Sequence, residues 1–384
     1  MRPVENNIPL SLYVHIPWCV KKCPYCDFNS HEKNNAFDEN KYVEALLLDL
    51  EKEVENNRHR TLSSIFFGGG TPSLFSADAI NTIISRAQKI FKFNDIEITL
   101  EANPGTFEQE KFNGFKDAGV NRLSIGIQSF NETHLKTLGR IHGSQQALTA
   151  VETARNAGFE NINLDLMFGL PQQTVQHAID DINTACEFNV THISHYQLTI
   201  EENTYFHKHT PVLPENDLIW EMQTQCQNLL AANQYQQYEI SAYSKKDKQC
   251  THNLNYWGFG DYIGIGAGAH GKTSAIHRDG LKIIRRWKHR QPQQYIEETL
   301  KGNAISGNQQ LAKEDTVFEF LLNALRLKTA TDIQTFKNHT GLDVTDLERT
   351  VKNIDPALLL LDKEKIGTTD KGYLFLNEIL ENLL

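Results

Sequence analysis

The chain has 384 residues, with 48 acidic and 38 basic side chains and a formal net charge of −10. That balance argues against a general nucleic-acid-binding protein, which presents a basic surface to the phosphate backbone. No apolar run reaches the roughly eighteen residues that a membrane span needs, and the N-terminus lacks the basic and apolar pattern of a secretory leader, so we expect a cytoplasmic protein without a membrane span.

Six short apolar runs, rich in β-branched residues, recur along the first half of the chain. They occupy residues 10–16, 64–67, 96–100, 122–127, 161–167 and 192–198. Apolar residues at helical spacing follow them, as in residues 42–54 and 77–91, which is the rhythm of βα units. Six such units predict an α/β fold built on a partial parallel (β/α)6 barrel, with its site at the carboxyl ends of the strands.

Three cysteines follow the first predicted strand in a C-x3-C-x2-C pattern: Cys19, Cys23 and Cys26. Three thiolates on one tight loop can hold three corners of a [4Fe–4S] cube and leave the fourth iron open. A structural zinc site is the alternative, with His15 or His31 as its fourth ligand. Disulfides are disfavoured because three neighbouring cysteines cannot all pair, and the remaining cysteines stand singly, as in a reducing compartment: Cys186, Cys226 and Cys250.

The cysteine pattern resembles the signature of the radical S-adenosylmethionine (SAM) enzymes. The longer string YVHIPWC, from Tyr13 to Cys19, is similar to the branch of that family that contains oxygen-independent coproporphyrinogen III dehydrogenase and haem chaperones. The resemblance covers about residues 10–270 and, more loosely, the C-terminus. It implies a [4Fe–4S] cluster whose fourth iron is chelated by SAM, and whose reduced form cleaves SAM to a 5′-deoxyadenosyl radical, while the protein supplies position and electrostatics.

A glycine-rich loop, Gly68-Gly69-Gly70-Thr71-Pro72, follows the second predicted strand. Glycines let the backbone approach a ligand closely, although Gly-Thr-Pro is also an ordinary turn. The loop lacks the lysine of a phosphate-binding P-loop. In the resembled family this loop lies along the methionine part of SAM, which implies that role for Gly69, Gly70 and Thr71.

Polar residues stand at similar places in three successive predicted strands: Glu101 in the third, Gln128 at the end of the fourth and Asp165 in the fifth. A polar side chain inside an apolar strand needs a structural hydrogen bond or a ligand, and any one of these alone is more often structural. With Arg140, they match positions that bind the carboxylate, ribose and neighbouring groups of SAM in the resembled family. Two tyrosines match its remaining aromatic contacts: Tyr13 and Tyr25.

Two departures distinguish the members of this branch. The dehydrogenase carries a further cysteine two residues after the third cluster ligand and a long N-terminal extension, whereas this chain has Phe28 there and eighteen residues before Cys19. The string from His252 to Trp257 matches the HNxxYW motif of the haem chaperones. Imidazole is a common haem ligand and aromatic rings pack on porphyrins, although a histidine beside aromatic residues is usually structural. The resemblance implies that His252 ligates haem, and Cys250 is a spare buried thiol or a second ligand.

Three further segments in the last third of the chain have interpretable sequences. Small residues in 262–271 allow close backbone contact, which we assign to the adenine side of SAM. The basic segment 282–290 is ordinarily a solvated face, or could meet propionates or an acidic lipid surface. Residues 318–327 and 344–354 are predicted helices, and 373–384 a closing apolar segment. We expect a barrel with the haem-motif extension over residues 1–300 and a small helical, winged-helix-like domain over 301–384.

Together these features predict a haem chaperone that binds haem, a [4Fe–4S] cluster and SAM and delivers haem to acceptor proteins, in the context of porphyrin biosynthesis. The alternative is the coproporphyrinogen III dehydrogenase, which oxidatively decarboxylates two propionates. The complete set of SAM residues keeps that alternative open, so enzyme activity is undecided and no catalytic residue is assigned. We expect respiratory, membrane-associated acceptors, a homodimer, no nucleic-acid partner, and a cytoplasmic location that includes the periphery of the inner membrane.

Overall fold

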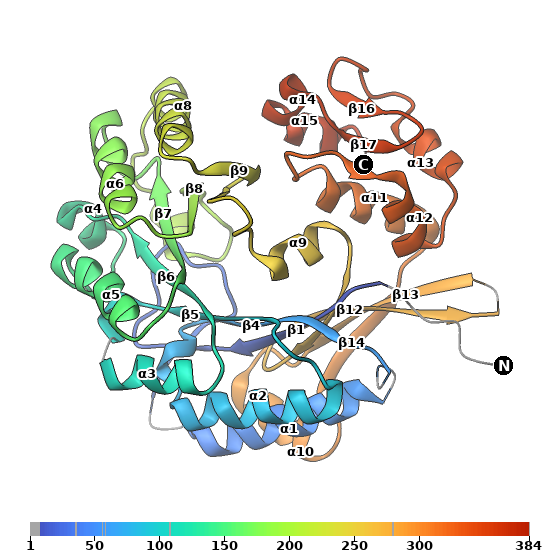
Figure 1. Cartoon of the computed structure of the whole chain (residues 1–384), viewed down its shortest axis with the longest axis horizontal. Helices are drawn as coiled ribbons and strands as arrows, with labels where there is room; N and C mark the ends of the chain where they lie inside the picture. The colour runs from blue at the N-terminus through green and yellow to red at the C-terminus, as the bar shows by residue number, and fades with distance from the viewer. Residues whose placement is uncertain are drawn as a thin grey trace.

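The computed structural model describes residues 8–34, 37–55, 57, 59–106, 109–278 and 280–383. Its largest element is a twelve-stranded sheet in which six strands run parallel side by side (Figure 1). In spatial order they are β1 (Leu10–Ile16), β4 (Leu62–Gly69), β5 (Glu97–Ala102), β6 (Arg122–Gln128), β7 (Asn161–Phe168) and β8 (His192–Gln197). Each overlaps one of the six apolar runs, so the prediction of a partial parallel barrel is confirmed.

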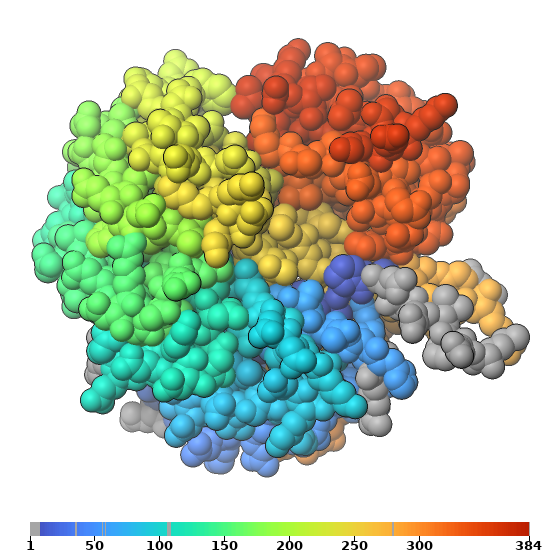
Figure 2. All heavy atoms as spheres, in the orientation of Figure 1, coloured from blue at the N-terminus to red at the C-terminus, as the bar shows by residue number. Residues whose placement is uncertain are grey.

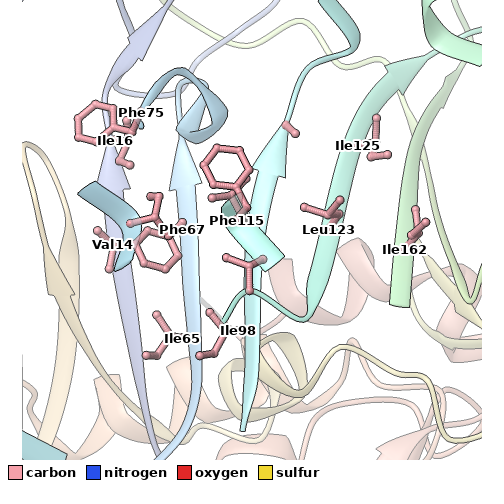
Figure 3. Packing of buried hydrophobic residues seen from close by; sticks show 14 of the residues in the cluster. Val14, Ile16, Ile65, Phe67, Phe75, Ile98, Phe115, Leu123, Ile125 and Ile162 are labelled. Atoms are coloured by element: carbon pink, nitrogen blue, oxygen red, sulfur yellow. The ribbon is translucent and has the colours of Figure 1, made fainter. Parts of the chain in front are cut away.

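Helices cover the outer face of these strands (Figure 1). Apolar side chains from both layers form the main core, which contains Phe67 of β4 together with Phe75 and Phe115 from the connections (Figure 3). The Ser76 side chain accepts a hydrogen bond from the N–H of Ala79 and so fixes the start of the second helix. The helices are α1 (Glu39–Val54), α2 (Ala77–Phe91), α3 (Gln109–Asp117), α4 (Glu132–Thr137), α5 (Ser144–Asn156) and α6 (Val175–Glu187).

The barrel stays open because further strands extend the sheet on both sides. Beyond β8 lie β10 (Ala242–Ser244) and β9 (Gln236–Glu239). Beyond β1 lie β11 (Asp261–Ile265), β12 (His270–His277), β13 (Gly280–Lys288) and β14 (Ile305–Gln310). β11 pairs with β1 in parallel and therefore adds a seventh parallel strand, which was not predicted.

The remaining short elements connect these strands. α7 (Tyr205–Lys208), α8 (Asn216–Ala232) and α9 (Thr251–Trp257) follow β8, and α10 (Pro292–Leu300) separates β13 from β14. Two short strands, β2 (Trp18–Cys19) and β3 (His31–Glu32), pair with each other and enclose the cysteine loop. Two 3-10 turns, η1 (Pro72–Leu74) and η2 (Pro104–Thr106), follow β4 and β5. None of the helices in the described part of the chain is long and apolar enough to cross a membrane.

The basic segment 282–290 is not the solvated face that its composition suggests. Lys288 of β13 is buried, and its Nζ lies 2.5 Å from Asp49 Oδ1 and 2.7 Å from Glu53 Oε1 on α1. Arg285 pairs with Glu319 of the C-terminal region. The cations of segment 282–290 therefore mainly form ion pairs that join β13 to neighbouring elements.

The C-terminal residues form a lobe beside the barrel, drawn in orange and red in Figure 2. Its interior is a second hydrophobic core that includes Phe320, Phe336 and Leu347. Its helices are α11 (Lys313–Ala324), α12 (Ile333–Thr340), α13 (Val344–Val351), α14 (Asp370–Leu374) and α15 (Leu376–Glu381). Its sheet contains β15 (Thr331–Asp332), β16 (Leu359–Leu361) and β17 (Lys365–Thr368). The helical appendage is as predicted, whereas the sheet was missed because its strands are too short to leave a pattern. The boundary at residue 300 stays a prediction, since β14 still pairs with β13.

Helix α9 lies between the barrel and the C-terminal lobe (Figure 1). At its start, Glu97 of β5 accepts hydrogen bonds from backbone N–H groups that include that of His252. At its end, the Arg326 guanidinium lies 4.4 Å from the centre of the Trp257 ring, and His339 donates to Gly258 O at 2.7 Å. Both cores therefore hold this helix.

Candidate functional site

A cavity of about 150 Å³ opens at the carboxyl ends of β5 to β8, beside the cysteine loop. This is where parallel barrels place their sites. Of the predicted residues, Tyr13 and His252 line a second cavity instead. All the others line this first one, which we call the cluster-side cavity: Cys19, Cys23, Tyr25, Cys26, Gly69, Gly70, Thr71, Glu101, Gln128, Arg140 and Asp165.

The cysteine loop is joined to the glycine loop by backbone hydrogen bonds. Gly70 N donates to Ile16 O, and Thr71 N donates to Trp18 O, both at 2.8 Å. Burial raises the pKa of the Cys19 thiol to about 11, while a hydrogen bond with Thr71 acts in the opposite direction. The first predicted cluster ligand is therefore part of a buried, backbone-anchored corner.

The three thiols suit a cluster with one open iron. All three cysteines are free, with Cys19 buried and Cys23 and Cys26 partly exposed toward the cavity. Arg140 Nη1 lies 3.6 Å from Cys23 Sγ, and Ser30 Oγ lies 3.5 Å from Cys26 Sγ. Donors of this kind stabilise and tune iron–sulfur clusters. These residues could hold a [4Fe–4S] cluster through three thiolates.

Both histidines that could complete a zinc site form hydrogen bonds to other residues. His15 Nε2 bonds to Asn29 O at 2.9 Å, and its Nδ1 bonds to Tyr13 OH at 2.9 Å. His31 Nε2 lies 3.3 Å from Asn29 Oδ1. Among the described residues, no three His, Cys, Asp or Glu side chains gather as a single metal ion would require. The geometry gives no support to a zinc site.

The glycine loop needs glycine for packing as well as for ligand access. Gly69 has φ +115°, and a Cβ there would lie 2.6 Å from the His15 ring. A Cβ on Gly70 would lie 2.6 Å from Trp18 O. Both clashes are too severe for an L side chain. The loop therefore sits directly on β1 and the cysteine loop.

Two partly buried carboxyl groups, those of Glu101 and Asp165, line the cluster-side cavity from β5 and β7. Glu101 Oε2 accepts from Gly69 N at 3.1 Å, while Asp165 accepts from Ser124 Oγ at 3.2 Å and from Asn163 Nδ2 at 2.8 Å. Burial, reinforced by the nearby charge of Asp165, raises the pKa of Glu101 to about 8. Burial also raises the pKa of Asp165. A cationic group of a ligand would stabilise the charged form of either carboxyl.

Arg140 and Gln128 are held by residues that the sequence analysis missed. Arg140 Nη2 donates to Asn103 Oδ1 at 2.7 Å and to Gly126 O at 2.6 Å. Gln128 has φ +69°, and its Oε1 accepts from Tyr196 OH at 2.7 Å. Left-handed backbone at a non-glycine residue persists only where its surroundings hold it, and it occurs at helix ends and turns as well as at functional sites. Asn103 directly follows a strand end, a position that could have flagged it.

The second cavity is larger, about 690 Å³, and adjoins the first. It shares Phe28, Gly69 and Glu101 with the cluster-side cavity. Its volume lies in the range of cofactor and drug sites, and its aromatic walls suit a flat apolar ligand. The other residues that line this aromatic cavity are Tyr13, His15, Asn29, Phe66, His252, Asn253, Tyr256, Trp257, Tyr262, Gly268, His270 and Arg290. The 262–271 segment thus borders the aromatic cavity rather than the cluster-side one.

His252 lines the aromatic cavity from the first turn of α9. Its Nδ1 lies 3.0 Å from Ser64 Oγ, which itself donates to Ser11 Oγ at 2.8 Å. Because the Ser64 proton is used in that bond, Ser64 accepts from His252 Nδ1–H, and the lone pair lies on Nε2. Burial lowers the pKa of His252 to about 3, so the ring is neutral. A neutral imidazole with a fixed Nδ1–H is the usual form of a metal-ligating histidine.

Cys250 is placed as a spare buried thiol and lines neither cavity. Its Sγ donates to Glu97 Oε1 at 3.4 Å, and burial raises its pKa to about 12. A thiol in this state is a poor ligand, because the thiolate is the form that binds metals.

Comparisons with known proteins agree with this arrangement. Residues 13–185 match the Radical SAM superfamily, and residues 311–375 match the HemN C-terminal domain. The protein named heme chaperone HemW from Haemophilus influenzae is 47% identical over 98% of this chain and 98% of its own. The protein of the same name from Bacillus subtilis is 34% identical over 96% of this chain and 97% of its own. The chain belongs to the HemW family.

Two further comparisons extend the HemW family match. The mouse protein named radical S-adenosyl methionine domain-containing protein 1, mitochondrial, is 32% identical over 100% of this chain and 89% of its own. The solved structure of HemN, the coproporphyrinogen III oxidase of Escherichia coli, superimposes with a TM-score of 0.82. That match covers 99% of this chain and 91% of HemN at 23% identity, so it shows a shared fold.

Family and fold are thus confirmed as predicted. The Radical SAM match implies a [4Fe–4S] cluster and SAM for this HemW family member. The roles of the individual site residues stay predictions.

Proposed function

We propose that this chain is a haem chaperone, which binds haem, a [4Fe–4S] cluster and SAM and transfers haem to acceptor proteins. The observation that carries the proposal is the aromatic cavity, which is large enough for a flat ligand and is lined by His252 with its Nε2 available. Near-full-length relatives named heme chaperone HemW support it. Haem is the cargo in this proposal.

The cluster-side cavity would hold the other two groups. Cys19, Cys23 and Cys26 would ligate the cluster, whose one-electron chemistry would act on SAM. The residues proposed to bind and orient SAM surround them: Tyr13, Tyr25, Gly69, Gly70, Thr71, Glu101, Gln128, Arg140 and Asp165. Tyr13 would do so from the aromatic cavity, across the shared Glu101 and Gly69.

A haem titration of the anaerobically reconstituted protein tests the proposal. We expect a Soret band that saturates with added haem, and a loss of affinity in His252→Ala with an unchanged iron–sulfur spectrum. The triple serine variant at the cluster cysteines should still bind haem, because His252 shares no ligand with the cluster. A wild-type protein that binds no haem would contradict the chaperone function.

The coproporphyrinogen III dehydrogenase is the second candidate function. It is favoured by the intact polar set around the cluster-side cavity, where Glu101 and Arg140 both have defined hydrogen bonds. Phe28 weighs against it: this side chain is 60% exposed between the two cavities, where the dehydrogenase carries a cysteine. Incubation with coproporphyrinogen III, SAM and a reductant should yield no vinyl product if the chaperone function is correct.

We also propose the setting of this transfer. The acceptors would be respiratory, membrane-associated haem proteins, and the chaperone would act as a homodimer in the cytoplasm, including at the periphery of the inner membrane. Size-exclusion chromatography with light scattering tests the dimer, and membrane fractionation of cell extracts tests the location.

A further inference from the structure

Arg290 occupies a fixed place on the exposed rim of the aromatic cavity. It follows β13, and its backbone carbonyl accepts a hydrogen bond from Asn29 Nδ2 at 2.8 Å. The preceding carbonyl, that of His289, accepts from Gly268 N at 2.8 Å. Asn29 and Gly268 also line the cavity. The backbone that carries Arg290 is therefore part of the cavity wall.

The charges of the neighbouring cations are already matched. Arg285 pairs with Glu319, Arg286 pairs with Glu53, and Lys288 lies between two carboxylates of α1. In the described part of the chain, Arg290 forms no such ion pair. It therefore offers its whole guanidinium to a ligand, with five N–H donors in a planar fork.

Arg290 also dominates the electrostatics of the cavity. The other groups there that could be charged near neutral pH are Glu101 and three histidines. Burial raises the pKa of Glu101 to about 8 and lowers the pKa of His15, to about 4, and that of His270. Among the described residues that line the cavity, Arg290 is the one whose side chain is always positively charged near neutral pH. The protein as a whole carries a net charge of −10 and therefore repels anions, so a local cation such as Arg290 favours the binding of an anionic group at this cavity.

We propose that Arg290 binds a carboxylate of the haem cargo and so fixes the edge of the porphyrin at the rim of the aromatic cavity. Haem combines an apolar ring, a central iron and two propionates on one edge. The cavity offers aromatic walls, an imidazole and a cation in one space. A guanidinium can bind a carboxylate through two parallel hydrogen bonds, which gives orientation as well as affinity. This inference rests on the proposed haem-chaperone function.

The test compares haem with haem dimethyl ester, in which both propionates are blocked. The reconstituted full-length protein is titrated with each, as wild type, Arg290→Gln, Arg290→Lys and the control Arg278→Gln, an exposed arginine outside the cavity. We expect Arg290→Gln to weaken haem binding about tenfold or more, as for the loss of a charged hydrogen-bond pair. Its affinity for the ester should equal that of the wild type. Arg290→Lys should fall between the two, and Arg278→Gln should match the wild type.

The outcomes separate this inference from the function on which it rests. A wild-type protein that binds neither porphyrin contradicts the haem-chaperone function itself. Wild-type affinity for haem in Arg290→Gln overturns the carboxylate contact while leaving that function standing. An equal loss for haem and for the ester, or a changed melting temperature or iron–sulfur spectrum, would identify Arg290 as a structural residue and also overturn the contact.

Discussion

Because Ser64 accepts a hydrogen bond from His252, we expect haem affinity to depend on the Ser64 hydroxyl. Ser64 Oγ lies 3.0 Å from His252 Nδ1, both groups are buried, and the serine proton is committed to Ser11. Ser64→Ala removes the acceptor and leaves a buried N–H unpaired, which costs about 1–3 kcal/mol. It also frees the ring to exchange its proton between Nδ1 and Nε2, so that the ligating nitrogen is no longer fixed.

We expect haem affinity to fall about 10- to 100-fold in Ser64→Ala, the usual cost of removing the partner of a metal-ligating histidine. That range equals about 1.4–2.8 kcal/mol, since each tenfold change is about 1.4 kcal/mol, and so it agrees with the cost of one buried unpaired N–H. Haem titration at the Soret band measures the affinity. Resonance Raman of the ferrous complex should show a weaker iron–histidine bond, because the imidazole loses the partner that makes it a better donor.

Two variants of the same strand serve as controls. Ser63→Ala removes a hydroxyl that bonds to Leu10 O at 3.0 Å and to Ser11 Oγ at 3.1 Å but does not touch the imidazole, so its haem affinity should fall less than that of Ser64→Ala. Ser64→Thr keeps the hydroxyl and should recover most of the affinity. Unchanged haem affinity and an unchanged iron–histidine stretch in Ser64→Ala would show that Ser64 does not fix the ligating nitrogen of His252.

Further predictions concern the cluster, the Glu101 carboxyl group and the buried ion pair. Serine at any of the three loop cysteines should abolish the visible absorption of the cluster, whereas Cys186→Ser should leave it intact. Glu101→Ala should weaken SAM binding by about 1–3 kcal/mol in calorimetry of the anaerobic holoprotein, and undiminished binding would exclude a contact. The pKa of Glu101 is raised from 4.5 to about 8 in the folded protein, so ionisation of this carboxyl lowers the free energy of unfolding as the pH rises from about 5 to 8. Glu101→Gln cannot ionise, so in urea unfolding of the apoprotein its stability relative to the wild type should increase over the same pH range. Lys288→Met should cost about 3–5 kcal/mol by urea unfolding, because the buried Asp49 carboxylate loses its cationic partner while Glu53 keeps Arg286, whereas Lys282→Met on the same strand should cost much less.

The strands of the barrel and the cluster-side residues could be predicted from sequence for a physical reason. Strands buried on both faces are nearly continuous apolar runs, so the few polar residues in or after them, such as Glu101 and Asp165, stand out. The spacing of the cysteines is likewise local, because one loop carries all three.

What could not be predicted depends on contacts between distant segments. Ser64 and His252 are 188 positions apart, and Lys288 is 239 positions from Asp49, so no local pattern links them. β11 was missed because its short apolar run leads directly into small residues, which resemble a ligand loop more than a parallel strand. In the sequence Arg290 is indistinguishable from the other cations of its segment, because the ion pairs of Arg285, Arg286 and Lys288 are formed with residues far away in the chain.

Helix α9 has its two ends attached to different hydrophobic cores, through Glu97 at the start and Arg326 and His339 at the end. Seven residues are too few for a helix to persist alone, so its helical state depends on both attachments. The amide protons of α9 should therefore be protected from exchange by the free energy needed to separate the two cores, which is smaller than that of global unfolding. Hydrogen exchange at these amides would measure how strongly the C-terminal lobe is attached to the barrel.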